Sequence, residues 1–189
     1  MKYAPAALAV LTFTAAACAQ DTTNVFADGP NGEKVHSPSG FVCPAVIGHF
    51  ERDAVGERDP QAGSDFCAYS GRDGVYGTIT LAPLPRSYDP KAMLASEFVV
   101  QEGVGGRMVD EATLTLGPKT SPLPVYSRTY ETAKLESMHY KTVFTIAAIG
   151  SWAVEATVEY ADPRDIDLKT DFVSAVYAGA LAKIAAQPH

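Results

Sequence analysis

Two cysteines within the stretch 39–84 constrain the fold of this chain more than any other feature of its sequence. Cys43 and Cys67 both follow the N-terminal segment, and residues typical of β-strands flank each of them. In an oxidising compartment such an even pair predicts a disulfide, and closing a loop of this length stabilises a fold by about 3–4 kcal/mol. A reactive thiol pair is the alternative, but redox cysteines usually lie two residues apart beside a helix start. We therefore predict a structural disulfide between Cys43 and Cys67.

Residues 1–19 have the pattern of an export signal. A short basic start is followed by the uncharged run 6–17, which is too short to span a bilayer. Two processing routes fit this pattern. Residues 17–20, Ala-Cys-Ala-Gln, form a small-x-small site for ordinary signal peptidase, whereas residues 15–18 resemble a lipoprotein box in which Cys18 becomes the lipid-modified N-terminus. Both routes predict a periplasmic protein, either soluble or anchored to the outer membrane, whose one expected membrane contact is a lipid on Cys18.

The rest of the chain divides into a tether and one domain. Residues 20–37 are polar and rich in turn formers, with too few apolar residues to fold alone, so we predict a flexible tether. Residues 38–187 are expected to form a single globular domain. The composition is ordinary for a globular protein, with 47% hydrophobic residues, and a domain of about 150 residues buries roughly two-thirds of its unfolded surface.

The charge of the chain argues against two classes of partner. The formal net charge is −7, and removal of the export signal makes it more negative because that segment has one basic and no acidic residue. No basic stretch is available to release counterions from nucleic acid, so nucleic-acid binding is not expected. The sequence also has no run of Lys or Arg that would attract it to anionic lipid.

Alternation of apolar and polar residues predicts eight strands and two tight hairpins. The strands are expected at 41–43, 50–55, 66–70, 75–81, 108–116, 125–132, 138–149 and 152–160. Short turns at 71–74 and 150–151 make the flanking strands antiparallel. In the last hairpin we expect the apolar residues of both strands, such as Ile146 and Val154, on one face and the charged residues, such as Glu155, on the other.

Two helices are predicted from matching start signals. Asp89-Pro90 supplies an N-cap and a proline at the first helical position, and Gly103 ends this helix. Asp162-Pro163 repeats the signal before an apolar periodicity that continues to Ala186. The order of strands and helices predicts an α+β fold, with an antiparallel sheet of about six to eight strands and two helices layered as a sandwich.

This order of elements, over residues 39–186, resembles the PsbP-type α/β/α sandwich, in which an antiparallel sheet carries helices on its faces. The opening Gly40-Phe41-Val42-Cys43-Pro44, followed by Phe50-Glu51-Arg52, is similar to uncharacterised small exported envelope proteins of Gram-negative bacteria. The resemblance to the envelope proteins implies an exported accessory protein without known chemistry. PsbP-type domains serve as accessory subunits, and to carry that role over would be an analogy at the level of the fold.

Most candidate catalytic patterns have simpler structural explanations. The sequence has no Gly-x-Ser-x-Gly elbow, and Ser39 and Ser151 adjoin glycines in expected turns. The segment Gly103–Gly106 follows a helix, whereas phosphate-binding loops precede one. A group of aspartates crowds the second helix start, where capping explains it, and lacks the central Gly and closing Glu of an EF-hand loop. These aspartates are Asp162, Asp165, Asp167 and Asp171.

Two acidic patterns on strands complete the search. His49, Glu51 and Asp53 alternate on one expected strand face and could assemble a weak metal site, although a solvated charged strand is the simpler explanation. Glu155 and Glu159 share a strand face about 13 Å apart, which is wide for a glycosidase pair. We therefore assign no catalytic, cofactor-binding or metal-binding residue and expect no cofactor.

Two functional hypotheses follow from these observations. The first is a non-enzymatic accessory or binding domain of the envelope that contacts an envelope protein or a small ligand through its sheet face or the loop 103–106. The second is a hydrolase or other enzyme whose site is assembled from residues distant in sequence. Its first candidates for mutation are His139, Tyr140, Glu155 and Arg128.

Overall fold

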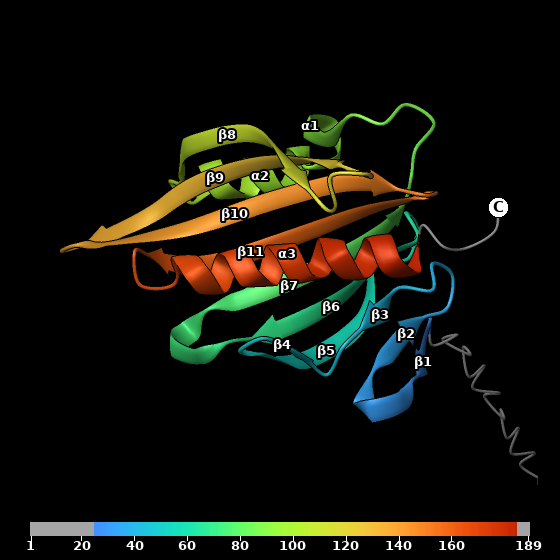
Figure 1. Ribbon diagram of the computed structural model, residues 1–189. Helices are drawn as coiled ribbons and strands as arrows, with labels where there is room; N and C mark the ends of the chain where they lie inside the picture. Colours follow the sequence, from blue (N-terminus) through green and yellow to red (C-terminus); the bar gives the residue numbers. More distant parts are fainter. Residues whose placement is uncertain (1–24, 185–189) are drawn as a thin grey trace, which may run out of the picture.

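An eight-stranded antiparallel sheet forms the centre of the computed structural model, which describes residues 25–184 (Figure 1). Its strands follow the spatial order β4-β5-β6-β7-β11-β10-β9-β8. Their bounds are Val46–Ile47 (β4), Phe50–Asp59 (β5), Ser64–Ser70 (β6), Tyr76–Pro83 (β7), Arg107–Leu116 (β8), Leu123–Leu135 (β9), Met138–Ile149 (β10) and Trp152–Asp162 (β11). The predicted α+β class and its antiparallel sheet are confirmed. The predicted export signal and Cys18 lie outside the described residues.

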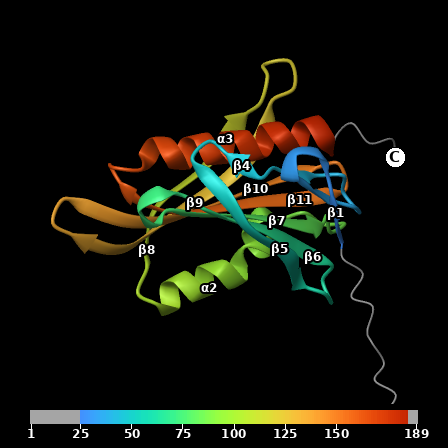
Figure 2. The same cartoon turned by 90° about the horizontal axis from the view of Figure 1, so that it is seen from below.

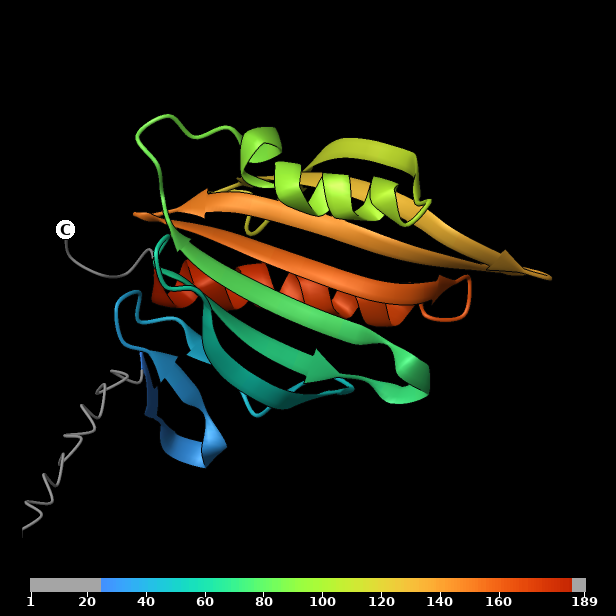
Figure 3. The ribbon, with the colours of Figure 1, turned by 180° about the vertical axis from the view of Figure 1, so that it is seen from behind.

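Helices cover both faces of this sheet. Helix α3 (Ile166–Lys183) lies on one face, and α1 (Pro90–Met93) and α2 (Ala95–Gly103) lie on the other, as Figure 2 shows for α2 and α3. In Figure 3, α1 and α2 cover the β8–β10 side of their face and leave β5–β7 uncovered by helix within the described chain. Within residues 25–184, no helix has the length and apolar character needed to cross a membrane.

The central hairpin β10–β11 carries apolar residues on both faces. Ile146 pairs with Glu155, and Val143 pairs with Val158. Because paired residues of antiparallel strands share a face, Ile146 lies on the α2 side with Glu155, whereas Val143 and Val158 lie on the α3 side. The prediction of one apolar and one charged face for this hairpin is wrong, since a helix covers each face and each therefore needs apolar contacts.

The first predicted helix starts at its predicted cap, whereas the second starts a few residues later than predicted. Asp89 caps α1 by accepting the backbone N–H of Lys91 at 2.9 Å. One non-helical residue divides the predicted first helix into α1 and α2, so the structure has three α-helices in its described part. Helix α3 begins at Ile166 rather than directly after Asp162-Pro163, because Asp162 still belongs to β11.

A small three-stranded sheet precedes the main one and packs against it. Its strands, in spatial order, are Phe26–Asp28 (β1), Lys34–His36 (β2) and Val42–Cys43 (β3). Single 3-10 turns lie at Pro30–Gly32 and Arg72–Gly74. Phe26 is 2% exposed and His36 is fully buried. The prediction of a flexible tether over residues 20–37 is therefore wrong for the described residues 25–37, because buried side chains anchor this segment to the core.

Two buried ties hold the small sheet to the main sheet. Cys43 on β3 and Cys67 on β6 lie at disulfide distance, with their Cα atoms 6.4 Å apart, as predicted. On β2, the two ring nitrogens of His36 hydrogen-bond Ser39 Oγ at 2.6 Å and the Asp65 carboxylate at 2.8 Å. Because Asp65 belongs to β6, both ties end on the same strand of the main sheet.

Candidate functional site

A groove lies on the α2 side of the sheet, between α2 and the strands that it leaves uncovered. Two cavities of about 240 Å³ and 450 Å³ meet there, and both are lined by Arg58 and Glu97. We call this space the α2 groove. Its charged and aromatic lining residues are Arg58, Asp59, Glu97, Glu155, Glu159, Phe66 and Phe144.

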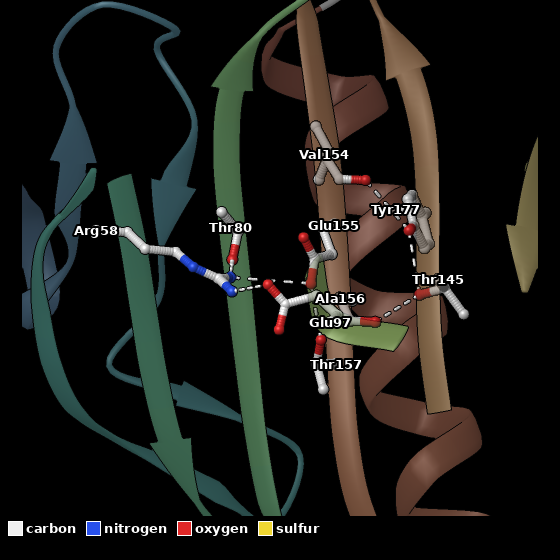
Figure 4. Close-up of polar contacts among 9 residues, drawn as sticks. All are labelled: Arg58, Thr80, Glu97, Thr145, Val154, Glu155, Ala156, Thr157 and Tyr177. Atoms are coloured by element: carbon white, nitrogen blue, oxygen red, sulfur yellow. Dashed lines mark hydrogen bonds and ion pairs between the residues drawn. The ribbon is translucent and has the colours of Figure 1, made fainter. Parts of the chain in front are cut away.

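Arg58 crosses the groove from its position near the end of β5. One guanidinium nitrogen donates to Thr80 Oγ1 at 2.7 Å, and the other donates to the Glu97 carboxylate (Figure 4). Because Thr80 lies on β7 and Glu97 on α2, the side chain joins the floor of the groove to its helical wall. The Arg58 guanidinium also lies 3.9 Å from Oε1 of Glu155, which is too long for a hydrogen bond.

Glu155 is the buried carboxylate of the groove. It lies on β11 between its register partners Thr80 and Ile146, and the residue is only 9% exposed. The Thr157 hydroxyl donates to Glu155 Oε1 at 3.0 Å. Burial raises the pKa of this carboxyl to about 6, although Arg58 and Thr157 oppose the rise. A perturbed carboxyl in a cleft is a common mark of a functional site.

The described lining of the groove combines an acidic surplus with some apolar surface. Its one cationic residue is Arg58. Its carboxylates are Asp59, Glu97, Glu155 and Glu159. Threonine hydroxyls from β7, β10 and β11 form a polar floor, and the rings of Phe66 and Phe144 lie beside it. On the helical wall, Gln101 Oε1 is buried without a hydrogen-bond partner in the described part of the chain. Such a lining suits a small ligand with both polar and apolar parts.

A second constellation has the order of hydrogen bonds of a Ser-His-Asp triad but is closed to substrate. His36 and Ser39 are fully buried, Asp65 is 5% exposed, and the rings of Phe26 and Trp152 pack against the imidazole. Burial lowers the pKa of His36, and the neighbouring Asp65 opposes this effect. We interpret the network as structural. The sequence explains Ser39 as a turn residue and does not reveal the network, because Asp65 lies 29 residues from His36 on another sheet.

The four residues named for an enzymatic site lie in different places. Glu155 lines the α2 groove, and Arg128 packs beneath α2 with its guanidinium over an aromatic ring. His139 hydrogen-bonds Glu131 at the far end of the β9–β10 hairpin. Tyr140 lines a third cavity of about 160 Å³, which shares Thr142 and Glu159 with the larger cavity of the groove but is not lined by Glu155, Arg128 or His139. The structure therefore does not assemble these four side chains into one site.

The weak metal pattern on the second predicted strand is also not assembled. His49 lies in the turn between β4 and β5, so it does not alternate with Glu51 and Asp53 along a strand. Asp53 accepts a hydrogen bond from the Ser70 hydroxyl at 2.8 Å. Within residues 25–184, no three His, Cys, Asp or Glu side chains are placed to hold a metal ion together.

The aspartates before α3 bind separate protein partners instead of converging on one point. Asp162 accepts a hydrogen bond from Lys141 at 2.5 Å. Asp165, which is 2% exposed, accepts from the Arg164 guanidinium and from the backbone N–H of Ala161 at 3.1 Å. The guanidinium lowers the pKa of the Asp165 carboxyl more than burial raises it. These contacts close the turn from β11 into α3.

Arg58 and Glu97 stand at the centre of the groove, and no sequence pattern identifies them. An arginine near the end of a charged strand and a glutamate on a short helix are typical of solvated surfaces, so no local signal marks them. Comparison of the chain with protein-family models, with curated proteins and with solved structures finds no match. The functional inference rests on the geometry of the groove.

Proposed function

We propose that this chain is an exported envelope protein that acts as a non-enzymatic binding domain, with the α2 groove as its ligand site. The observation that carries the proposal is Glu155, a carboxylate almost fully buried on the floor of the groove. A buried carboxylate with incomplete compensation lowers the stability of a fold. Such a cost is common at binding sites, where a ligand supplies the missing interaction.

The shape and lining of the groove support ligand binding. Small-molecule sites are concave, largely preformed and lined by apolar surface with a few converging polar groups. The α2 groove has this combination, and the bridge from Arg58 to Thr80 and Glu97 holds its helical wall against the sheet. Contacts within the protein thus hold the walls of the groove in place.

Two features support the envelope location. Residues 1–19 have the pattern of an export signal, and the Cys43–Cys67 pair at disulfide distance is typical of proteins from oxidising compartments. We infer a periplasmic protein that is either soluble or anchored through a lipid on Cys18. The intact mass of the mature chain decides between the two, because a chain that starts at unmodified Gln20 contradicts lipidation.

Protein-observed NMR of the exported, oxidised chain tests the ligand site. A panel of small anionic, neutral and cationic compounds is added to the wild type, to Ser96→Trp and to Ala95→Trp. Ser96 lines the smaller cavity, whereas Ala95 is an exposed neighbour on the same helix outside the lining. Binding that Ser96→Trp abolishes and Ala95→Trp preserves supports the proposal. If no compound shifts the groove resonances, or if both variants bind like the wild type, the proposal is wrong.

An accessory role through protein docking is the second candidate, and exposed apolar side chains favour it. Val99, Val100 and Val104 are 68%, 58% and 69% exposed at the end of α2 and in the loop 103–106. A photo-crosslinking residue at position 104, compared in cells with one at the exposed Asp171 on α3, tests this role. One dominant envelope protein captured from position 104 alone supports docking, and equal capture from both positions contradicts it.

A further inference from the structure

The ionisable groups of the α2 groove do not balance one another. Arg58 provides one positive charge, and the lining provides four carboxylates. Deepening the proposed ligand-binding function, on which this inference rests, we propose that the groove binds an organic cation, an alkylammonium or alkylguanidinium group with an apolar stem.

The guanidinium of Arg58, the one cationic group in the described lining, already donates hydrogen bonds to other acceptors. Arg58 donates to the Thr80 hydroxyl and to the Glu97 carboxylate, and it approaches Glu155 only to 3.9 Å. Thr157 supplies one neutral hydrogen bond to Glu155 Oε1. A ligand ammonium group placed in the smaller cavity would therefore meet a buried carboxylate that lacks a charged hydrogen-bond donor. Such charge-assisted hydrogen bonds are the strong ones.

The larger cavity offers a place for the stem of the ligand. Phe66 and Phe144 line this cavity together with Val100, which gives apolar surface beside the threonines of the floor. Aromatic faces also attract organic cations. Glu159 lies at the same cavity and on the same strand face as Glu155, about 13 Å away by strand rise. A linear diamine can thus present ammonium groups to two carboxylates of one strand.

An anionic ligand fits the groove poorly. The Arg58 guanidinium already binds the Glu97 carboxylate, so a ligand carboxylate or phosphate that it also bound would lie beside that negative charge. The ligand would also lie near Glu155 and Asp59, so repulsion between like charges would oppose its ion pair with Arg58. The arrangement of fixed charges therefore selects against anions as well as for cations.

The cationic group of the ligand can belong to a free amine or to a basic side chain of a peptide, because the two have the same chemistry. Cadaverine and spermidine represent the first source, and N-acetyl-lysine methylamide and a short Gly-Lys-Gly peptide represent the second. Glutarate and 1,5-pentanediol are anionic and neutral probes of similar length. Isothermal titration and chemical-shift mapping with the mature, oxidised chain at pH 7.5 and low salt measure all six probes, because salt screens such contacts.

Matched charge-removing variants locate the binding. Glu155→Gln is expected to weaken cation binding at least about tenfold, the size of one charge-assisted hydrogen bond. Asp171→Asn removes the same unit of charge from an exposed position on α3, which covers the opposite face, and is expected to bind like the wild type. Glu97→Gln, at the helical wall, repeats the test if Glu155→Gln does not fold.

Each outcome has a distinct meaning. Groove shifts with the amines or lysine probes that Glu155→Gln weakens and Asp171→Asn preserves support the inference, and the stronger probe class identifies the source. Equal weakening by Glu155→Gln and Asp171→Asn overturns it, because binding then follows net charge alone. Binding of glutarate or pentanediol in the groove without the cations also overturns it but leaves the proposed ligand site intact. Absence of binding by every probe overturns both.

Discussion

The two faces of the main sheet differ in how completely helices cover them and in whether their buried polar groups are satisfied. On the α3 face, one long helix packs along the sheet, and its buried polar group is satisfied: the Tyr177 hydroxyl donates to Thr145 Oγ1 at 3.1 Å or to the Val154 carbonyl at 3.3 Å (Figure 4). On the α2 face, a short helix covers part of the sheet and leaves a groove with a buried carboxylate. The comparison indicates that the α3 face is a closed layer of the core, whereas the α2 face keeps an open groove, where we propose the ligand site.

The largest effect is expected from opening the α3 face. Phe172 is fully buried and packs against the rings of Phe50 and Tyr69. Phe172→Ala should lower the free energy of unfolding by about 3–5 kcal/mol through lost burial and a cavity. Denaturant unfolding measures the loss. Val99→Ala, at an exposed position of α2, is the control and should stay within about 0.5 kcal/mol of the wild type. Similar losses for both variants would contradict the comparison.

Two glycines provide the next contrast. A Cβ atom at Gly77 would lie 2.6 Å from the Phe172 ring, so Gly77→Ala must displace a core side chain of the α3 face. We expect a loss of about 3 kcal/mol in the free energy of unfolding. A Cβ atom at Gly103, at the end of α2, would meet nothing within 4 Å, and Gly103→Ala should gain up to about 1 kcal/mol. Thermal and denaturant unfolding measure both. A change of the same sign in the free energy of unfolding of both variants would refute this contrast.

The buried carboxylate of the α2 face should make stability depend on pH. Because the pKa of Glu155 is about 6 in the fold and 4.5 ordinarily, its stabilising contribution is complete below pH 4.5 and is lost as the pH rises through 6. Glu155→Gln does not titrate, so its stability relative to the wild type should rise by about 2 kcal/mol between pH 4 and pH 8. Denaturant unfolding at both pH values measures the change. Glu159→Gln, at an exposed position of the same strand, is the control, and an equal change in both variants would argue against burial as the cause.

The smallest expected effect compares two tyrosine hydroxyls. Tyr177→Phe removes the buried hydrogen bond of the α3 face and should cost about 1 kcal/mol. Tyr76 lies on β7 with 53% of its surface exposed, so Tyr76→Phe should change the free energy of unfolding by less than about 0.5 kcal/mol. Urea unfolding of the two variants under one buffer measures the difference. If Tyr76→Phe lowers the free energy of unfolding more than Tyr177→Phe does, the uncovered strands also contribute to stability.

Local patterns in the sequence predicted most individual elements. The hairpin turn at 150–151, the Asp89 cap of α1 and the periodicity of α3 all appear in the fold. The predicted faces of β10 and β11 were wrong because a period-two pattern shows which residues share a face of one strand, whereas the register between strands decides which faces coincide. The tether prediction failed for a related reason, since Phe26 and His36 are buried only against distant residues.

The sequence by itself determined the α+β class, the antiparallel pairing of neighbouring strands and the pairing of Cys43 with Cys67, because each depends on residues close together or on a unique pair. The tertiary structure alone decided the candidate site. Arg58, Glu97 and Glu155 come from β5, α2 and β11, and each is an ordinary surface charge in its own segment. Packing gives these residues their unusual environment. Burial of a charged carboxylate costs free energy only when neighbouring strands and a helix exclude water from it.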